Sequence, residues 1–278
     1  MITSVLVDGV AVNNTKRFIV NIKDAGGANI DINSYARGGR DGVALAKPFY
    51  RGMVISMEWF IIADSASDLA TQRDEMAKIF RLKVDRTESQ TKRLGFTLAN
   101  GVTKEIPVVF TQFKSDISPD DIHTSRILVQ AQSELEYMYS ATETTLNLQI
   151  FAGSGMPIPM PIPMNFAAPL GGDASVANNQ GNAEYYPTIV MHGTLGAFDL
   201  KNTTTDKTFS YSGSLDADDY LTLDFYNRTA VLNGVSNVLA NVSGDWWWLG
   251  LGHNTLKLTT SSGDGYAEVK YRNAYKGI

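Results

Sequence analysis

The chain of 278 residues contains no cysteine. This absence excludes disulfide scaffolds, zinc sites with cysteine ligands, thiolate nucleophiles and iron–sulfur clusters. Basic residues are also few, because 24 Lys and Arg stand against 29 Asp and Glu. A protein that neutralises nucleic-acid phosphates normally carries a basic surplus. We therefore expect neither thiol chemistry nor a specific nucleic-acid partner.

Long apolar runs are missing as well. No segment approaches the roughly 20 apolar residues that span a bilayer. The first residues, MITSVLVDGVAVNN, lack the basic start and apolar core of a signal peptide. We expect a soluble protein made in the cytoplasm, without membrane insertion.

The residues that are abundant favour β structure. The chain holds 24 Gly, 12 Tyr and 12 Phe, a mixture typical of strands joined by tight turns. Alternating prolines at Pro157, Pro159, Pro161 and Pro163 cannot donate in a sheet interior. They indicate a boundary, so we predict domains at 1–150 and 151–278. Residues 151–172 form either a Pro-rich linker or an edge strand of the second domain.

The first half reads as strands around one helix. Asp8-Gly9 lies between apolar residues of Ser4–Val12 and predicts a hairpin turn. Ser65 followed by Asp68 resembles a capping box, and Leu69, Ala70, Met76, Ala77 and Phe80 form a stripe at helical spacing. Further predicted strands are Phe18–Ile22, Tyr50–Ala63, Arg93–Leu98, Glu105–Phe113 and Ile127–Leu135. Ala25–Gly42 is a long polar segment, too large for a simple hairpin loop.

The second half reads as β structure throughout. Seven short runs at 8–12 residue spacing predict an antiparallel sandwich. They are Tyr186–His192, Phe198–Asn202, Lys207–Tyr211, Tyr220–Asp224, Thr229–Leu232, Leu256–Thr260 and Ala267–Arg272.

These runs and the turns between them resemble a known family. The strings YYPTIVMHGTL, FSYSGSLDADDYLTLDFYNRTAVLNGVSN, DWWWLGLGHNTLKLTT and AEVKYRNAYKGI resemble the C-terminal domain of siphophage distal tail proteins. YRGMVISMEWFIIADSASDLATQRDEMAKIF is similar to the strand–helix unit of the same family. One departure is in the turn Leu251-Gly252-His253-Asn254. Several members of the family have Pro before the glycine, where this chain has Leu251.

The resemblance implies a fold and a role. The fold is a tail-tube-like N-terminal two-sheet β-sandwich with one flanking α-helix, followed by a galectin-like antiparallel β-sandwich. The role is that of a structural virion protein, a baseplate hub at the tail tip. Six copies, with a trimer as the alternative, form a ring that connects the tail tube protein to the tail-tip or tail-associated protein. The outer domain carries a receptor-binding protein or other accessory parts in some relatives.

No motif for catalysis is present, and we expect no enzyme activity and no cofactor. The chain lacks a nucleophile elbow, a phosphate-binding loop and a zinc-protease motif. His123, His192 and His253 lie far apart and have no ligand partner at metal-binding spacing. Asp216, Asp218 and Asp219 recur like a calcium loop but lack its Gly and closing Glu, which leaves a weak Ca²⁺ site or a solvated hairpin.

Two groups of residues are candidate contacts. Trp246, Trp247 and Trp248 are consecutive, and strand alternation places Trp247 in the core with Leu249 and turns Trp246 and Trp248 the other way. Trp246 and Trp248 are thus candidates for a glycan or partner contact. Arg37, Gly38, Gly39 and Arg40 are candidates for the ring interface. The alternative function is a carbohydrate-binding adhesion module that contacts a cell-surface polysaccharide through exposed aromatics.

Overall fold

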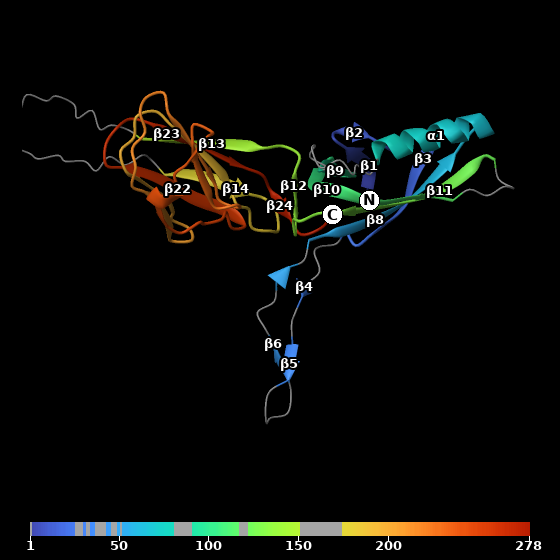
Figure 1. The fold of residues 1–278 in the computed structure, drawn as a ribbon, viewed down its shortest axis with the longest axis horizontal. Helices are drawn as coiled ribbons and strands as arrows, with labels where there is room; N and C mark the ends of the chain where they lie inside the picture. Colours follow the sequence, from blue (N-terminus) through green and yellow to red (C-terminus); the bar gives the residue numbers. More distant parts are fainter. Residues whose placement is uncertain are drawn as a thin grey trace, which may run out of the picture. The chain divides into compact units, whose positions relative to one another are not determined.

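The computed structural model describes residues 2–25, 30–31, 34–36, 43–45, 49–50, 52–80, 91–116, 122–150 and 174–278. The chain divides into two compact units, Met1–Ala141 with Tyr275–Ile278, and Thr142–Ala274. Strands dominate both units, and α1 (Ala66–Ile79) is the one α-helix among the described residues (Figure 1). The predicted mainly β fold with one helix in the N-terminal part is confirmed.

The first unit is organised around one sheet. Its strands are β1 (Ile2–Val7), β2 (Val10–Ala11), β3 (Arg17–Lys23), β8 (Val54–Ile62), β9 (Lys92–Leu98), β10 (Thr103–Ser115), β11 (Thr124–Gln132), β12 (Met138–Ser140) and β24 (Ala274–Tyr275). They run in the order β2-β1-β9-β10-β11-β8-β3, with β12 beside β10 and β24 beside β12.

Strand β10 joins the two layers of this unit. Its first part, Thr103–Val108, pairs with β9, and its second part, Val109–Ser115, pairs with β11. The register shifts between Phe110 and Gln112. An irregularity of this kind bends a strand and increases its twist. The two sheets of the predicted sandwich are therefore continuous through one long bent strand.

Turn chemistry explains the first hairpin. Asp8 and Gly9 adopt φ values of 51° and 80° between β1 and β2, as a two-residue hairpin turn requires. Farther along the chain, β4 (Ile30–Asp31) pairs with β7 (Phe49–Tyr50), and β5 (Ser34–Ala36) pairs with β6 (Val43–Leu45). The sequence predicted only a long polar segment here. A pairing of two short strands need not follow the apolar–polar alternation of a half-buried sheet, so the pattern gave no signal.

Helix α1 begins at the predicted cap. The side chain of Ser65 accepts a hydrogen bond from the backbone N–H of Asp68, 3.2 Å away. Leu69, Met76 and Phe80 are buried. The predicted stripe was wrong for Ala70 and Ala77, which are exposed. The helix contacts the sheet along a narrower line than the run of apolar residues suggested.

Phe80, just after α1, lies at the centre of the first core. On β8, the alternate residues Ile55, Met57, Trp59 and Ile61 are fully buried. The ring of Phe80 lies 5.9 Å from that of Trp59 and 5.0 Å from that of Phe110, measured between centroids. Large aromatic rings contribute much of the apolar area that a core buries. This cluster therefore ties the end of the helix to β8 and to the second part of β10.

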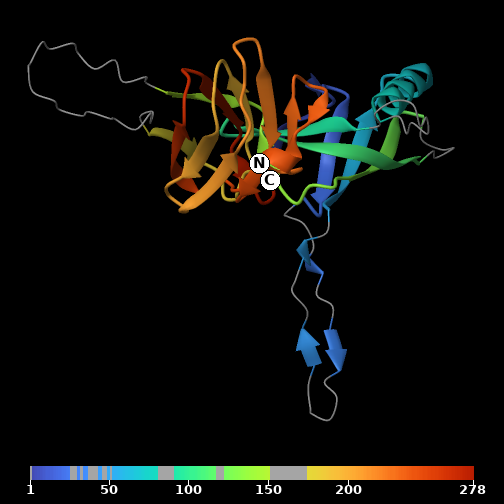
Figure 2. The ribbon, with the colours of Figure 1, turned by 60° about the vertical axis from the view of Figure 1, so that its left-hand side comes forward.

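The second unit is a sandwich of two antiparallel sheets (Figure 2). One has six strands in the order β13 (Thr144–Gln149), β23 (Tyr266–Tyr271), β15 (Thr188–His192), β18 (Tyr220–Asp224), β19 (Thr229–Leu232) and β20 (Ser236–Asn237). The other has five, β14 (Ser175–Asn179), β22 (Gly252–Thr260), β16 (Phe198–Asn202), β17 (Lys207–Tyr211) and β21 (Val242–Gly244). A short 3₁₀ turn, η1 (Leu239–Asn241), precedes β21.

The inner faces of the two sheets form the second core. Phe209 and Phe225 are fully buried, with ring centroids 5.2 Å apart. Trp247 is also fully buried, and its ring lies 4.6 Å from that of Phe225. The predicted strands Phe198–Asn202, Lys207–Tyr211, Tyr220–Asp224 and Thr229–Leu232 are found with the predicted bounds. Strands β13 and β14 were not predicted.

We predict that Phe80→Ala destabilises the first unit by about 3–5 kcal/mol, because it removes a fully buried ring and leaves a cavity. Native-state hydrogen exchange at the β8 amides measures this free energy. Leu128→Ala, at a residue that is 40% exposed on β11, is the matched control. The control is expected to change the free energy by about 0.5 kcal/mol or less. Equal losses in the two variants would contradict the central role of Phe80.

Candidate functional site

The tryptophan run of the second unit begins with a residue that is half-buried. The ring of Trp246 lies 4.8 Å from that of Phe209 and 5.2 Å from that of Phe225, between centroids. Trp246 therefore packs against the core. Strand alternation predicted that it turns away from the core, and this prediction was wrong. Residues 245–248 lie outside the strands, so the strict alternation of a strand does not apply to them.

Trp247 is the anchor of this run. It is fully buried together with Leu249, as predicted, and its indole Nε1 donates a hydrogen bond to the carbonyl of Leu200, 3.1 Å away. A buried indole N–H without a partner would be costly. The bond therefore fixes the run against strand β16.

Trp248 belongs to an aromatic cluster near the surface. Its ring lies 6.1 Å from that of Tyr186, which in turn lies 5.9 Å from the 46% exposed Tyr226. The ammonium of Lys207 lies 3.9 Å from the centroid of the Trp248 ring, a cation–π contact. That contact occupies one face of the indole. Trp248 therefore lies at the edge of the aromatic cluster. Its ring does not provide the open aromatic surface on which a sugar could stack.

Buried asparagines hold the loops beside the tryptophans. Asn254 is fully buried; its Oδ1 accepts from the N–H of Gly250 at 2.8 Å, and its Nδ2 donates to the carbonyls of Gly250 and Gly252. Asn202 donates to the carbonyl of Trp248 at 3.1 Å. The sequence analysis identified the turn around Gly252 but missed these side chains. The apolar–polar alternation of β16 and β22 could have identified them, because it places Asn202 and Asn254 on the inner face of the sheet.

The acidic loop of the second unit is a hydrogen-bonded turn. Asp219 accepts from the Nδ2 of Asn233 at 2.7 Å and from the N–H of Asp216 at 3.0 Å. The bond from Asn233, followed by that from Asp216, holds the pKa of the Asp219 carboxyl below its usual range. In the described part of the chain, no group of three or more His, Asp or Glu side chains is placed to hold a metal ion.

The candidate ring residues Arg37, Gly38, Gly39 and Arg40 lie outside the described residues. Their assignment stays a prediction.

The first unit presents apolar side chains on the side of the sheet opposite its core. Phe18, Ile62 and Leu128 are 43%, 49% and 40% exposed, and Phe18 pairs with the half-buried Phe60 across β3 and β8. We call these four residues the outer patch.

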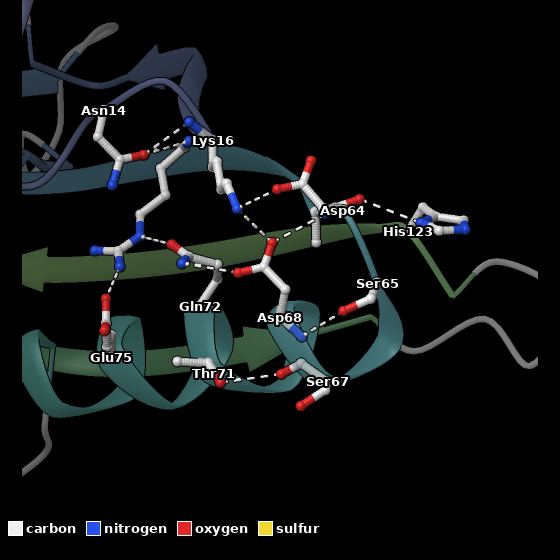
Figure 3. Close-up of polar contacts among 12 residues, drawn as sticks. Asn14, Lys16, Asp64, Ser65, Ser67, Asp68, Thr71, Gln72, Glu75 and His123 are labelled. Atoms are coloured by element: carbon white, nitrogen blue, oxygen red, sulfur yellow. Dashed lines mark hydrogen bonds and ion pairs between the residues drawn. The ribbon is translucent and has the colours of Figure 1, made fainter.

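Polar contacts hold α1 over the other face of the sheet (Figure 3). The ammonium of Lys16 lies 2.5 Å from a carboxylate oxygen of Asp64 and 2.7 Å from one of Asp68. The guanidinium of the buried Arg17 donates to Gln72 at 2.8 Å and to Glu75. The edge strand β3 is thus joined to the start and the middle of the helix by charged hydrogen bonds, which are among the stronger ones in proteins.

These contacts shift two pKa values in opposite directions. Hydrogen bonds to Asp64 and Asp68 raise the pKa of Lys16. The hydrogen bond from Lys16, followed by that from the backbone N–H of Asp64, lowers the pKa of Asp68. Both shifts favour the charged pair.

Comparison with known proteins finds a family model that matches part of the second unit. Residues 180–275 match the model described as the C-terminal domain of the siphovirus-type tail component. The resemblance to siphophage distal tail proteins is confirmed. The matched residues comprise β15–β23 of the sandwich, including the tryptophan run and Asn254.

Solved structures extend the likeness to the whole fold. The crystal structure of the phage SPP1 Dit protein (gp 19.1), described as a paradigm of the hub adsorption apparatus in phages that infect Gram-positive bacteria, is 10% identical, with a TM-score of 0.64. The match covers 98% of each chain. A phage P2 baseplate structure in its activated conformation with Ca matches over 94% of this chain and 92% of that chain, with 10% identity and a TM-score of only 0.45. Curated proteins give no match.

In the second unit we predict that Asn254→Ala lowers the free energy of unfolding by about 1–3 kcal/mol, because it leaves part-buried backbone groups of Gly250 and Gly252 without their side-chain partner. Urea unfolding followed by tryptophan fluorescence measures the change. The control is His253→Ala, since His253 is the exposed neighbour in the same turn. A loss of similar size in both variants would contradict the role of the Asn254 side chain.

The lowered pKa of Asp68 predicts a pH dependence of the first unit. Its contribution to stability is present above the unfolded pKa of about 3.9 and is lost as the pH falls through the folded value. The contribution of Lys16 is present below about pH 10.4 and is lost as the pH rises through its raised folded value.

Thermal unfolding midpoints measured across the acidic range are therefore expected to fall more steeply for the natural protein than for Asp68→Asn. Asp74→Asn, at an exposed position of the same helix, is the control and keeps the natural slope. Indistinguishable profiles for the two variants would refute the contribution of Asp68.

Proposed function

We propose that the chain is a structural tail protein of a siphophage, a distal tail or baseplate hub subunit that forms a ring between the tail tube and the tail tip. The observation that carries the proposal is the match of residues 180–275 to the siphovirus-type tail component domain. The fold shared with a hub protein over 98% of both chains supports it.

The proposed role is geometric and not enzymatic. A ring of identical copies requires a head-to-tail interface that closes, because an interface that does not close produces a filament. We assign ring formation to the first unit and the outward-projecting role to the second. The outer patch supports this assignment, since its exposed apolar residues, with the ion pair of Arg126 and Glu58 among them, offer a neighbour both apolar and charged contacts on one face. Six copies are the number that we propose.

The proposed partners follow from this position. The ring contacts the tail tube protein on one side and a tail-tip or tail-associated protein on the other, and its place is the tail tip of the virion. The first 150 residues hold 17 basic and 18 acidic side chains. A ring with almost no net charge would let DNA pass without binding its phosphates. None of the described helices has the length and apolar character needed to cross a membrane.

The alternative function, a carbohydrate-binding module acting through Trp246 and Trp248, gains no support from these two residues. Trp246 packs against the core, and Lys207 covers one face of Trp248. A contact between the aromatic cluster and a partner protein, such as a receptor-binding protein, agrees better with this geometry. Trp and Tyr rings beside a basic residue are typical of protein–protein interfaces.

We predict that the purified protein forms a closed ring at high concentration and that Phe18→Asp shifts it towards monomers, because a carboxylate in the outer patch opposes burial against a neighbour. Native mass spectrometry counts the copies, and negative-stain imaging shows closure. Val235→Asp, at an 87% exposed residue of the second unit, is the matched control and retains the ring. A protein that stays monomeric both alone and in the presence of its tail tube protein would refute the ring.

A further inference from the structure

A polar hollow opens on the outer side of the five-stranded sheet of the second unit. Its volume is about 400 Å³, within the range of small-molecule sites. The lining comes from β16, β17, β21 and β22 and from the chain next to them. Its side-chain hydroxyls belong to Ser210, Ser212, Ser243, Thr259, Thr260 and Ser261, with Tyr211 beneath. One carboxylate, Asp199, is the only charged group among the lining residues.

Several of these groups have hydrogen-bonding capacity left over. Asp199 accepts from the hydroxyl of Ser210 through Oδ1, at 2.5 Å, which leaves Oδ2 available. Within the described residues, the hydroxyls of Ser243, Thr259 and Ser261 have no hydrogen-bond partner. Each hydroxyl can donate one hydrogen bond and accept two. The hollow therefore gathers one free carboxylate oxygen and three free hydroxyls around one space.

The strand register explains why these groups converge. Asp199 lies opposite Ser210 on β17 and opposite Thr259 on β22, and Ser210 lies opposite Ser243 on β21. Side chains at paired positions share one face of a sheet. The four residues thus form a row across four strands.

The chemistry of the hollow selects its ligand. A lining without a cation and with one carboxylate disfavours phosphates and other anions. The rings of Phe198 and Tyr211, with centroids 5.2 Å apart, are buried in the core on the inner face of the sheet and stiffen the strands beneath the hollow. A neutral ligand with many hydroxyls matches the free carboxylate oxygen and the free hydroxyls of the hollow.

We propose that this hollow binds a neutral glycosyl unit, with Asp199 accepting from adjacent sugar hydroxyls and Ser243 and Thr259 completing the contacts. This site is separate from the tryptophan run and does not depend on ring formation. The ligand comes either from a free sugar or from a unit within a neutral polysaccharide.

The test uses the full chain, labelled with ¹⁵N, titrated with methyl glycosides of glucose, galactose and N-acetylglucosamine. A parallel arm measures retardation in gels that contain the neutral polysaccharide dextran. We expect shifts at amides of β16, β17, β21 and β22, with millimolar dissociation constants for at least one glycoside or retardation by dextran. Binding in the first arm indicates a free sugar as a sufficient ligand, and retardation alone indicates a unit of a polymer.

Variants separate this site from the rest of the unit. Asp199→Ala is expected to weaken binding about tenfold or more, and Ser243→Ala about threefold or more. Asp218→Ala, an exposed carboxylate of the acidic loop, and Thr222→Val, on the outer face of the other sheet, are matched controls that retain binding. Thermal unfolding verifies that each variant folds.

The proposal is overturned by the absence of binding to every probe at roughly 100 mM sugar. It is also overturned by equal losses in variants and controls, or by shifts at these amides with Ca²⁺ or inorganic phosphate in place of sugar.

Discussion

Buried asparagine side chains set the geometry on which the second unit depends. Asn254 satisfies the backbone of Gly250 and Gly252, and Asn202 accepts the N–H groups of Thr204 and Thr205 while donating to the carbonyl of Trp248. Inside a protein, an unpaired polar group is costly and a fully satisfied network is rigid. These contacts fix the loops at one end of the sandwich. They therefore determine where the tryptophan run enters the core and how it reaches Leu200 on β16.

The first unit uses a different device. Its sheet has one face covered by the core and by α1, and the charged contacts of Lys16 and Arg17 hold the edge strand β3 to that helix. Covering one face leaves the other to carry the outer patch. In the structural role that we propose, the subunit acts by its shape, and the helix contributes by supporting the sheet from the face opposite the outer patch. The helix keeps the sheet rigid, so that in the proposed ring the opposite face would meet a neighbour in one orientation.

The sequence predicted the elements whose signals are local. Asp8-Gly9 marks its turn because few residue pairs adopt two positive φ values easily, and Ser65 marks the start of α1 because its oxygen satisfies a free N–H. It failed where the outcome depends on contacts far along the chain. The burial of Trp246 follows from Phe209 and Phe225, and Asn202 and Asn254 meet although 52 positions separate them. Side-chain alternation alone could not show that free hydroxyls from β21, from β22 and from the chain just after β22 share one hollow.

Identity of only 10% across a fold shared over 98% of both chains indicates that this fold tolerates very different sequences. In this chain, turns, alternating burial and a few satisfied polar side chains hold the sandwich together, and none of them constrains the outward-facing positions. Asp199, Thr259 and Ser243 occupy such positions, whereas Leu200 and Leu258 beside them face the core. Substitution of the outward set can therefore alter what the second unit binds without disturbing the sandwich. In a tail protein, this separation allows the contact surface to change while the framework that presents it stays the same.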